Sequence, residues 1–334
     1  MTTMTRRRVI RLMAAGGLMS CGASLAGASG AGSSPSPWLH LWHGQALGAD
    51  VSLQIYHADK SQADRIIDNA VGLLREMEGL FSLYRTDSLL NQLNTTGMLL
   101  KPAAPFLDLL RTAQQVSHAT QGAFDITVQP LWQFYKNHFT AGRKTVSNLS
   151  AADLAAVRRH IGYDGLLVTV DKIAFARPGM AATLNGIAQG YVTDQVSAYL
   201  AQEGLTEVLV DMGEYRALGP QAGGAPWRIG LADPFRPGGL ADVLEMRRGA
   251  VATSSGSGDI FDPQGDYHHL LDPRTGLSPS RYASVTVTAP EATTADALST
   301  AFCSLSEPDI RTCLKSFSGT HVRLTDPQGH VALL

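Results

Sequence analysis

The chain has few cysteines, little net charge and no apolar stretch long enough for a comfortable membrane span. Only three cysteines occur in 334 residues. Neither a C-x-x-C pair nor a cluster of histidines and cysteines accompanies them, so nothing in the sequence indicates a zinc or iron–sulfur site. The net charge of −2 and the lack of a basic face argue against nucleic-acid binding. The apolar run at residues 12–25 is too short and too interrupted for a transmembrane helix.

Residues 1–28 are predicted to be an export signal. The stretch at 5–11 has paired arginines followed by two aliphatic residues and a cation, and it resembles a twin-arginine signal. An A-x-A site at 26–28 favours cleavage and a free periplasmic protein, whereas Cys21 in an imperfect lipobox leaves open a lipoprotein anchored in the inner membrane. Residues 29–44 are predicted to be a flexible linker, and residues 45–334 the folded domain.

Hydrophobic periodicity predicts an α+β fold, with a mixed sheet and packed helices, over a parallel doubly wound sheet. Helices are predicted at 61–81, 106–120, 149–161 and 188–203, with a short one from Leu89 after a cap at 86–88. Strands are predicted within 38–56, most clearly at 51–56, and at 166–170, 173–176, 208–211, 228–231, 242–247, 249–253, 267–271, 282–288, 322–325 and 331–333. Residues 122–128 are expected to form a turn and a short extended piece.

A helix is also predicted from Ala292 towards Glu307, since no Gly or Pro interrupts this segment. It places Asp296 and Thr300 four residues apart, on one helix face. One carboxylate and one hydroxyl can bind a hard divalent cation. Mg²⁺ often takes only one or two protein oxygens and leaves its other positions to water and substrate phosphates. The alternative is an Asp and a Thr on a solvated helix face.

Six sequence blocks precede this helix. They are FSLYRTDSLLNQLN at 81–94, GAFDITVQPL at 122–131, LNGIAQGYVTD at 184–194, VLVDMGEYRALG at 208–219, VATSSGSG at 251–258 and YHHLLDPRTG at 267–276. In this order and at these spacings the blocks resemble the ApbE family, the FAD:protein FMN transferases, over roughly residues 45–334. The resemblance implies an ApbE-like fold, FAD as substrate and Mg²⁺ as cofactor.

The resemblance also implies roles for individual residues. Asp296, Thr300 and the backbone carbonyl of Ala188 would bind the cation, and all three are hard oxygen donors. His269 precedes Asp272 by three residues, as a histidine does in the family. It would accept the proton of an acceptor hydroxyl, with a purely structural role as the equal alternative. Its neighbour His268 should face the opposite side.

Further candidates would contact the flavin nucleotide, and each has a structural alternative. These residues are Ser82, Tyr84, Asp87, Asp125, Thr127, Ser254 and Arg274. Tyr84 would stack on the isoalloxazine ring or pack in the core against Phe81. Asp125 and Thr127 would lie near the nucleotide or cap a turn. The loop that begins at Ser254 would offer backbone N–H groups to phosphate or be only a turn, and Arg274 would face phosphate or fix its loop through an ion pair.

The chain departs from the family pattern at three positions. Thr183 and Gln189 stand where the family usually has an acidic residue and a lysine. Glu214 lies in the block at 213–219, which is one residue shorter than the corresponding family block. These changes resemble the NosX branch. Thr183 and Gln189 remove an ion pair or a phosphate contact that the acid and the lysine of the family pattern offer.

The predicted function is transfer of FMN from FAD to a Thr or Ser of an exported or membrane-bound redox protein, with release of AMP. An FAD pyrophosphatase and a flavin-binding accessory protein without turnover are the alternatives. Cys303 and Cys313 are expected to be free thiols more often than a disulfide.

Overall fold

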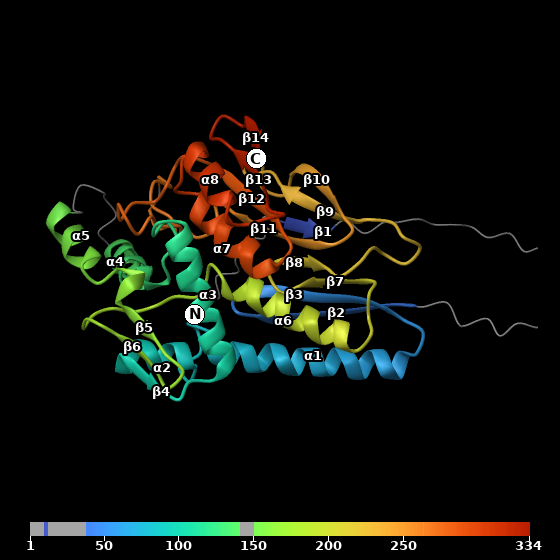
Figure 1. Ribbon diagram of the computed structural model, residues 1–334. Helices are drawn as coiled ribbons and strands as arrows, with labels where there is room; N and C mark the ends of the chain where they lie inside the picture. The colour runs from blue at the N-terminus through green and yellow to red at the C-terminus, as the bar shows by residue number, and fades with distance from the viewer. Residues whose placement is uncertain (1–9, 13–37, 141–149, 263) are drawn as a thin grey trace, which may run out of the picture.

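The centre of the molecule is an eight-stranded antiparallel sheet (Figure 1). The computed structural model describes residues 10–12, 38–140, 150–262 and 264–334. In spatial order the strands are β14 (Val331–Leu333), β13 (His321–Thr325), β12 (Ser284–Ala289), β11 (Gly249–Ser254), β8 (Tyr215–Ala217), β7 (Val208–Asp211), β3 (Ala49–His57) and β2 (Trp38–Ala46). β2 and β14 form its edges.

Two three-stranded antiparallel sheets accompany the large one. The first consists of β1 (Ile10–Leu12), β9 (Trp227–Ala232) and β10 (Leu240–Met246), and the second of β4 (Met98–Leu100), β6 (Lys172–Phe175) and β5 (Leu166–Val168). Trp227 and Ile229 of β9 share a buried cluster with Leu209 of β7. The neighbours Val208 and Val210 belong to the main core instead. Since side chains alternate along a strand, β9 and β10 cover one face of the large sheet.

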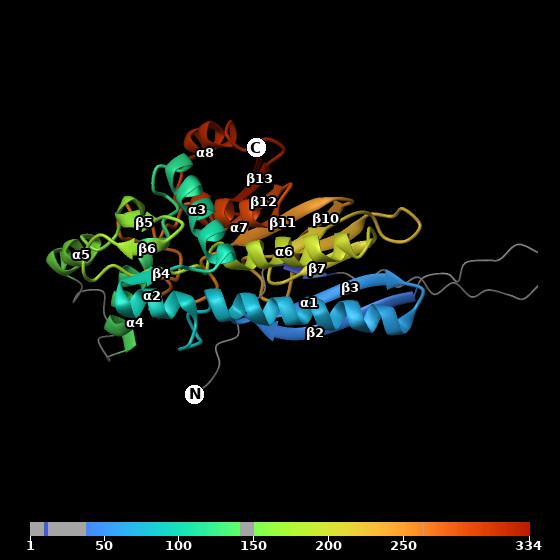
Figure 2. The ribbon, with the colours of Figure 1, turned by 60° about the horizontal axis from the view of Figure 1, so that its bottom comes forward.

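The helices cover the opposite face and one end of the molecule. They are α1 (Lys60–Phe81), α2 (Leu89–Thr96), α3 (Ala104–Ala119), α4 (Gln129–Thr140), α5 (Ala151–Arg158), α6 (Ala188–Gln202), α7 (Ala292–Phe302) and α8 (Glu307–Leu314), with the 3₁₀ turns η1 (Ile126–Val128) and η3 (Tyr163–Gly165). The helices α1, α6 and α7 pack on the sheet. In Figures 1 and 2, α2, α4, α5 and the β4–β6–β5 sheet gather at the left end.

The helix predictions with the strongest periodicity are confirmed. In α1 the buried residues recur every three or four positions, from Ala63 and Ile66 to Met77 and Phe81, so that one stripe faces the sheet. The cap before α2 is Ser88, whose hydroxyl accepts a hydrogen bond from the N–H of Asn91. The α+β class is confirmed, but every pairing among the described strands is antiparallel rather than mixed.

Two local predictions are wrong, and one helix was not predicted. Residues 267–271 form no strand. Only an isolated bridge links His268 to Ile260, and the N–H of His268 bonds Ser278 Oγ instead. Residues 122–128 end in the 3₁₀ turn η1, because the carboxylate of Asp125 caps it. The sequence predicts no element where α4 forms, and Tyr135 of this helix stacks on the ring of Phe261 far along the chain. Such tertiary packing overrides weak local propensity.

The predicted linker at 29–44 is too long at its C-terminal end, because β2 begins at Trp38 and pairs with β3 along its whole length. The rest of that linker lies outside the described residues. So do residues 1–9 and 13–28 of the predicted export signal, including Cys21, while β1 lies within it. None of the helices in the described part of the chain is long and apolar enough to cross a membrane. Cys303 and Cys313 are free thiols, both buried.

Candidate active site

A cavity of about 190 Å³ gathers residues of all six sequence blocks at one place. Its wall is formed by the start of β3, the turn after α1, the residues before η1, the first turn of α6, the β7–β8 turn, the loop after β11, the His269 loop and α7. These segments lie far apart in the sequence. The six blocks are separate in the sequence, and the fold brings them together at one site.

Asp296 and Thr300 both line this cavity, so the i, i+4 spacing does bring them to one wall. Asp296 is 4% exposed, and its Oδ2 accepts a hydrogen bond of 3.0 Å from the N–H of Gly190 near the start of α6. A Cβ added to Gly186 would lie 2.9 Å from Thr300 Oγ1. The turn that leads to Ala188, the first residue of α6, therefore runs against Thr300. The alternative of a solvated helix face is wrong for this pair.

The oxygen donors here fit a hard cation that takes few protein ligands. Asp296 offers a carboxylate and Thr300 a hydroxyl. Ala188 is buried at the N-terminus of α6 and offers a backbone carbonyl. In the part of the chain that the structure describes, no three His, Cys, Asp or Glu side chains gather as a metal site. A carboxylate, a hydroxyl and a backbone carbonyl are hard oxygen donors of the kind that suits Mg²⁺.

His269 lines the cavity and His268 does not, as the spacing predicted. The N–H of His269 bonds the carbonyl oxygen of Asp259 at 2.8 Å. Its Nδ1 lies 3.2 Å from the N–H of Asp259 and 3.4 Å from the carbonyl oxygen of the same residue. The first contact fits an unprotonated Nδ1 and the second a protonated one. The backbone of Asp259 thus orients the ring.

His268 points into the protein instead. It is 7% exposed, and its Nε2 lies 3.1 Å from the carbonyl oxygen of Pro279. Burial lowers the pKa of His268 below its ordinary value of 6.5, because a charged imidazole loses its hydration there. The buried Nδ1 of His268 has no hydrogen-bond partner among the described residues. Burial therefore favours the neutral form of this histidine.

Tyr84 stands at the rim of the cavity with 60% of its surface exposed. Its neighbour Phe81 is buried and stacks on Phe106. The alternative that Tyr84 packs with Phe81 in the core is therefore wrong. An exposed ring at a cavity mouth offers a face on which a planar ligand can stack.

Ser82 and Asp87 do not line the cavity but shape the turn that carries Tyr84. The buried hydroxyl of Ser82 accepts a hydrogen bond from the N–H of Tyr84. Asp87 is exposed, and its hydrogen bond to Arg85 holds the pKa of the carboxyl below its usual value. The side-chain amide of Asn91 donates to the carbonyl oxygens of Leu83 and Arg85. These residues position the turn from outside the cavity wall.

Asp125 both lines the cavity and caps η1. Its carboxylate accepts hydrogen bonds from the N–H and the hydroxyl of Thr127 and from the N–H of Tyr163. Burial nevertheless raises the pKa of Asp125, and the hydrogen bonds only oppose that shift. Thr127 is fully buried and accepts from the N–H of Gly162. Thr127 is thus structural, and Asp125 serves the turn and the cavity together.

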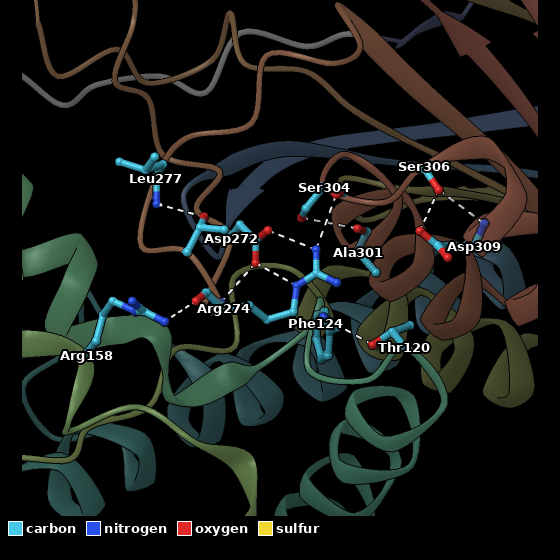
Figure 3. Close-up of polar contacts among 11 residues, drawn as sticks. Thr120, Phe124, Arg158, Asp272, Arg274, Leu277, Ala301, Ser304, Ser306 and Asp309 are labelled. Carbon is cyan, nitrogen blue, oxygen red and sulfur yellow. Dashed lines mark hydrogen bonds and ion pairs between the residues drawn. The ribbon is translucent and has the colours of Figure 1, made fainter. Parts of the chain in front are cut away.

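Ser254 reaches the cavity and Arg274 does not. The hydroxyl of Ser254 lies 2.8 Å from Ser299 Oγ and 3.4 Å from Thr300 Oγ1, which links the last residue of β11 to α7. Arg274 instead forms a two-point ion pair with Asp272 and also donates to the carbonyl of Ser304 (Figure 3). The pKa of Arg274 is raised by the hydrogen bond to Asp272. The guanidinium therefore fixes its loop through Asp272, outside the cavity wall.

The three departures from the family pattern all face the cavity: Thr183, Gln189 and Glu214 lie in its wall. Gly213 has φ +106, and a Cβ on it would lie 2.3 Å from Gln189 Nε2. The β7–β8 turn can therefore approach Gln189 only because a glycine is present there.

Sequence reasoning missed Trp132, Asp211 and Asp259, which also line the cavity. The sequence pattern indicates Asp211 only as a strand end, yet its carboxylate accepts hydrogen bonds from Ser52 and Gly213. The available signal is its place in the 208–219 block, two residues before Gly213. Among the lining residues that the structure describes, five are carboxylates and none is Lys or Arg. An anionic ligand would meet negative charge here.

Comparison with known proteins decides the family. The model of the ApbE family matches residues 47–324. The chain belongs to the ApbE family. The match includes every residue of the cavity wall, from Ala49 to Thr300.

Several relatives of this ApbE protein are named FAD:protein FMN transferase. The protein of that name from Haemophilus influenzae is 30% identical over 247 residues, which cover 70% of this chain and 71% of the relative. The one from Vibrio cholerae is 29% identical over 288 residues, with 82% and 83% covered. The crystal structure of the ApbE protein of Thermotoga maritima superimposes with a TM-score of 0.75 at 28% identity, over 88% of this chain and 96% of that one. The ApbE-like fold is thereby confirmed.

Proposed function

We propose that this ApbE protein is a Mg²⁺-dependent FAD:protein FMN transferase. The relatives that it resembles over most of its length carry this name. The observation that carries the proposal is the common cavity wall of Asp296, Thr300 and His269, with the start of α6 beside them. In the reaction, the hydroxyl oxygen of the acceptor attacks the FMN phosphorus of FAD. The anhydride P–O bond breaks, AMP leaves, and the hydroxyl proton passes to a base.

The charge of the cavity supports the need for a cation. The pyrophosphate of FAD is anionic, and the described lining holds carboxylates without Lys or Arg. Asp296, Thr300 and the carbonyl of Ala188 would hold Mg²⁺, which neutralises phosphate charge in phosphoryl transfer. Gln189 replaces the lysine that the family pattern has. This chain therefore depends more strongly on the divalent ion than a relative with the lysine.

The side chains around the cation suggest how the substrate is oriented. Tyr84 at the rim would stack on the isoalloxazine ring, while the loop from Ser254 to Gly258 offers backbone N–H groups to phosphate. His269 would take the hydroxyl proton on Nε2, in the tautomer whose Nδ1–H donates to the carbonyl of Asp259, 3.4 Å away. The fixed turn at Asp259 would keep the ring directed to the acceptor.

The proposal also covers the protein that accepts FMN and the cellular compartment of the enzyme. We infer a Thr or Ser of an exported redox protein, such as a membrane-bound subunit, as the acceptor. Delivery to the periplasm by the twin-arginine route rests on the arginines of residues 5–11. Cleavage at 26–28 would release a free protein, whereas modification at Cys21 would anchor it to the inner membrane. The NosX-like branch rests on Thr183, Gln189 and Glu214.

One incubation of the protein with FAD, Mg²⁺ and a candidate acceptor tests the function. AMP together with flavin fluorescence on the acceptor protein is expected. AMP with free FMN would instead identify an FAD pyrophosphatase, and no AMP would identify a flavin-binding accessory protein. Peptide mapping should find FMN on Thr or Ser, and an increment on Cys or His would contradict the phosphoester. Samples with EDTA and with Asp296→Ala provide the controls.

A further inference from the structure

The helix α7, which carries Asp296 and Thr300, lacks a cap of its own. The first N–H groups of an α-helix have no partner within the helix, and a side chain at the N-cap normally accepts one of them. Glu291 occupies the N-cap position of α7, but its side chain makes no capping hydrogen bond. These N–H groups are buried with Ala292 and Thr293, so they need an acceptor from elsewhere in the fold.

Asp194 supplies that acceptor from the neighbouring helix α6. Its Oδ1 accepts the N–H of Ala292 at 2.9 Å, and its Oδ2 accepts the N–H of Thr293 at 2.9 Å. The hydroxyl of Thr293 donates to the same Oδ2 at 2.6 Å. Asp194 is 9% exposed, and the charge of its carboxylate suits the positive end of the α7 dipole. Asp194 thus caps a helix to which it does not belong.

Arg216, on the large sheet, holds the carboxylate of Asp194 in place. The guanidinium of Arg216, in β8, donates through Nη1 to Asp194 Oδ1. The carboxylate therefore has four donors from two other elements, which balances the cost of burying its charge. The side chain of Asp194 bridges α6, α7 and β8.

The same two helices meet a second time beside the cavity. One helical turn before Asp194, the N–H of Gly190 donates to Oδ2 of Asp296. The two contacts fix α7 at its first turn and at Asp296. On α7, Ala292, Asp296 and Thr300 follow one another at intervals of four residues, about 6 Å per step. A shift or rotation of the first turn would therefore be passed on to both candidate metal ligands.

From these contacts we infer that Asp194 is a positioning residue, which sets the height and rotation of α7 so that Asp296 and Thr300 bind the cation together. This inference rests on the proposed function. Asp194 is not in the cavity wall, so it acts through α7 and not on the substrate. Residues that orient metal ligands typically account for about 10- to 100-fold in metal affinity or activity.

The test compares Asp194→Ala with the unaltered protein by Mg²⁺ affinity. Calorimetric titration of Mg²⁺ is done with saturating ADP, which carries a pyrophosphate but no flavin. We expect the dissociation constant to rise by at least about 10-fold, with AMP release from FAD regained at high Mg²⁺. Hydrogen exchange should become faster at the amides of Ala292 and Thr293. Asp194→Asn keeps the shape and one oxygen acceptor, and an intermediate Mg²⁺ affinity is expected; it also serves if Asp194→Ala fails to fold.

Asp59→Ala is the matched control. Asp59 caps α1 through the N–H of Gln62 at an exposed site away from the cavity, so the loss of this cap should leave Mg²⁺ affinity unchanged. Unchanged Mg²⁺ affinity in folded Asp194→Ala and Asp194→Asn would overturn the positioning role and leave the proposed function intact. The opposite result is also informative. If both variants bind Mg²⁺ more weakly but the unaltered protein releases no AMP from FAD, the positioning role is supported and the proposed function is overturned.

Discussion

Gly190 in α6 lies so close to Ala292 in α7 that a Cβ on the glycine would stand 2.3 Å from the carbonyl oxygen of Ala292. The same Cβ would lie 2.8 Å from Cβ of Asp296. The two helices therefore meet backbone to backbone at the point where the candidate cation site forms. A side chain of any size is excluded at this position.

Gly190→Ala should therefore destabilise the protein, although the same change in a helix is usually favourable. Alanine is normally better than glycine in a helix interior by about 1 kcal/mol. Here the added methyl group overpacks a rigid backbone contact, so we expect the free energy of unfolding to fall by about 1–3 kcal/mol. Gly72→Ala in α1 is the control, since a Cβ added there would meet nothing within 4 Å, and it should be neutral or stabilising. Urea denaturation of both variants measures the difference; equal stabilities would contradict the close contact.

Asp296→Ala should abolish most FMN transfer at ordinary Mg²⁺ while the protein stays folded. The carboxylate is the only charged group of the proposed ligand set. Its loss should lower the rate by at least about 10²-fold, because a catalytic cation contributes several kcal/mol to transition-state stabilisation. Thr300→Ser, which keeps the hydroxyl, should remain active. Near-normal transfer by folded Asp296→Ala would refute the cation site.

The fold was predictable where local and tertiary signals agree. The stripe of buried residues in α1 and the Ser88 cap of α2 were evident from spacing alone. The helix α4 was not, because its rings pack on Phe261 and Tyr267, which only the folded chain brings near. The His269 loop forms no strand, because its N–H groups bond a serine hydroxyl and a loop carbonyl instead of a neighbouring strand.

The site was predictable only in part, for a similar reason. The spacing of Asp296 and Thr300 is local to one helix, so their common face follows from the sequence. Asp194 in α6 caps α7 through the N–H of Ala292, which lies nearly one hundred residues later in the chain. No local sequence pattern reveals such a contact. Arg274 had two possible partners in the sequence, and geometry alone selects Asp272.

Export should depend on Arg6 and Arg7 together. Replacing both with lysine keeps the positive charge but removes the guanidinium pair that characterises twin-arginine signals. The double variant should therefore stay in the cytoplasm, as shown by cell fractionation and immunoblotting. Lysine at Arg11 alone is the control and should not block export. Unchanged periplasmic delivery of the double variant would show that another route is used.

Folding stability should fall as the pH drops below about 6.5, and His268 should account for part of that fall. Burial lowers the pKa of His268 in the folded protein, so between the folded and unfolded pKa values the unfolded chain binds more protons. Stability is then complete above the unfolded pKa and declines as the pH falls towards the folded pKa. His268→Gln can still donate to the carbonyl of Pro279 but cannot titrate. Thermal unfolding at pH 7.5 and 5.5 should show a smaller decrease for this variant. An equal decrease in both proteins would contradict the role of His268.

His269→Ala should separate a general base from a structural histidine. The ring lines the cavity, and both the N–H and the carbonyl oxygen of Asp259 lie near its Nδ1. Only in the tautomer with Nδ1–H can Nε2 accept a proton. If Nε2 is the base, the rate of FMN transfer should fall by about 10²-fold or more, while Mg²⁺ affinity and thermal stability change little. The adjacent His268→Gln, outside the cavity, should keep its transfer rate at pH 7.5. A fall of only a few fold for His269→Ala would assign deprotonation to the cation or a cavity carboxylate, and a large loss of stability would make the histidine structural.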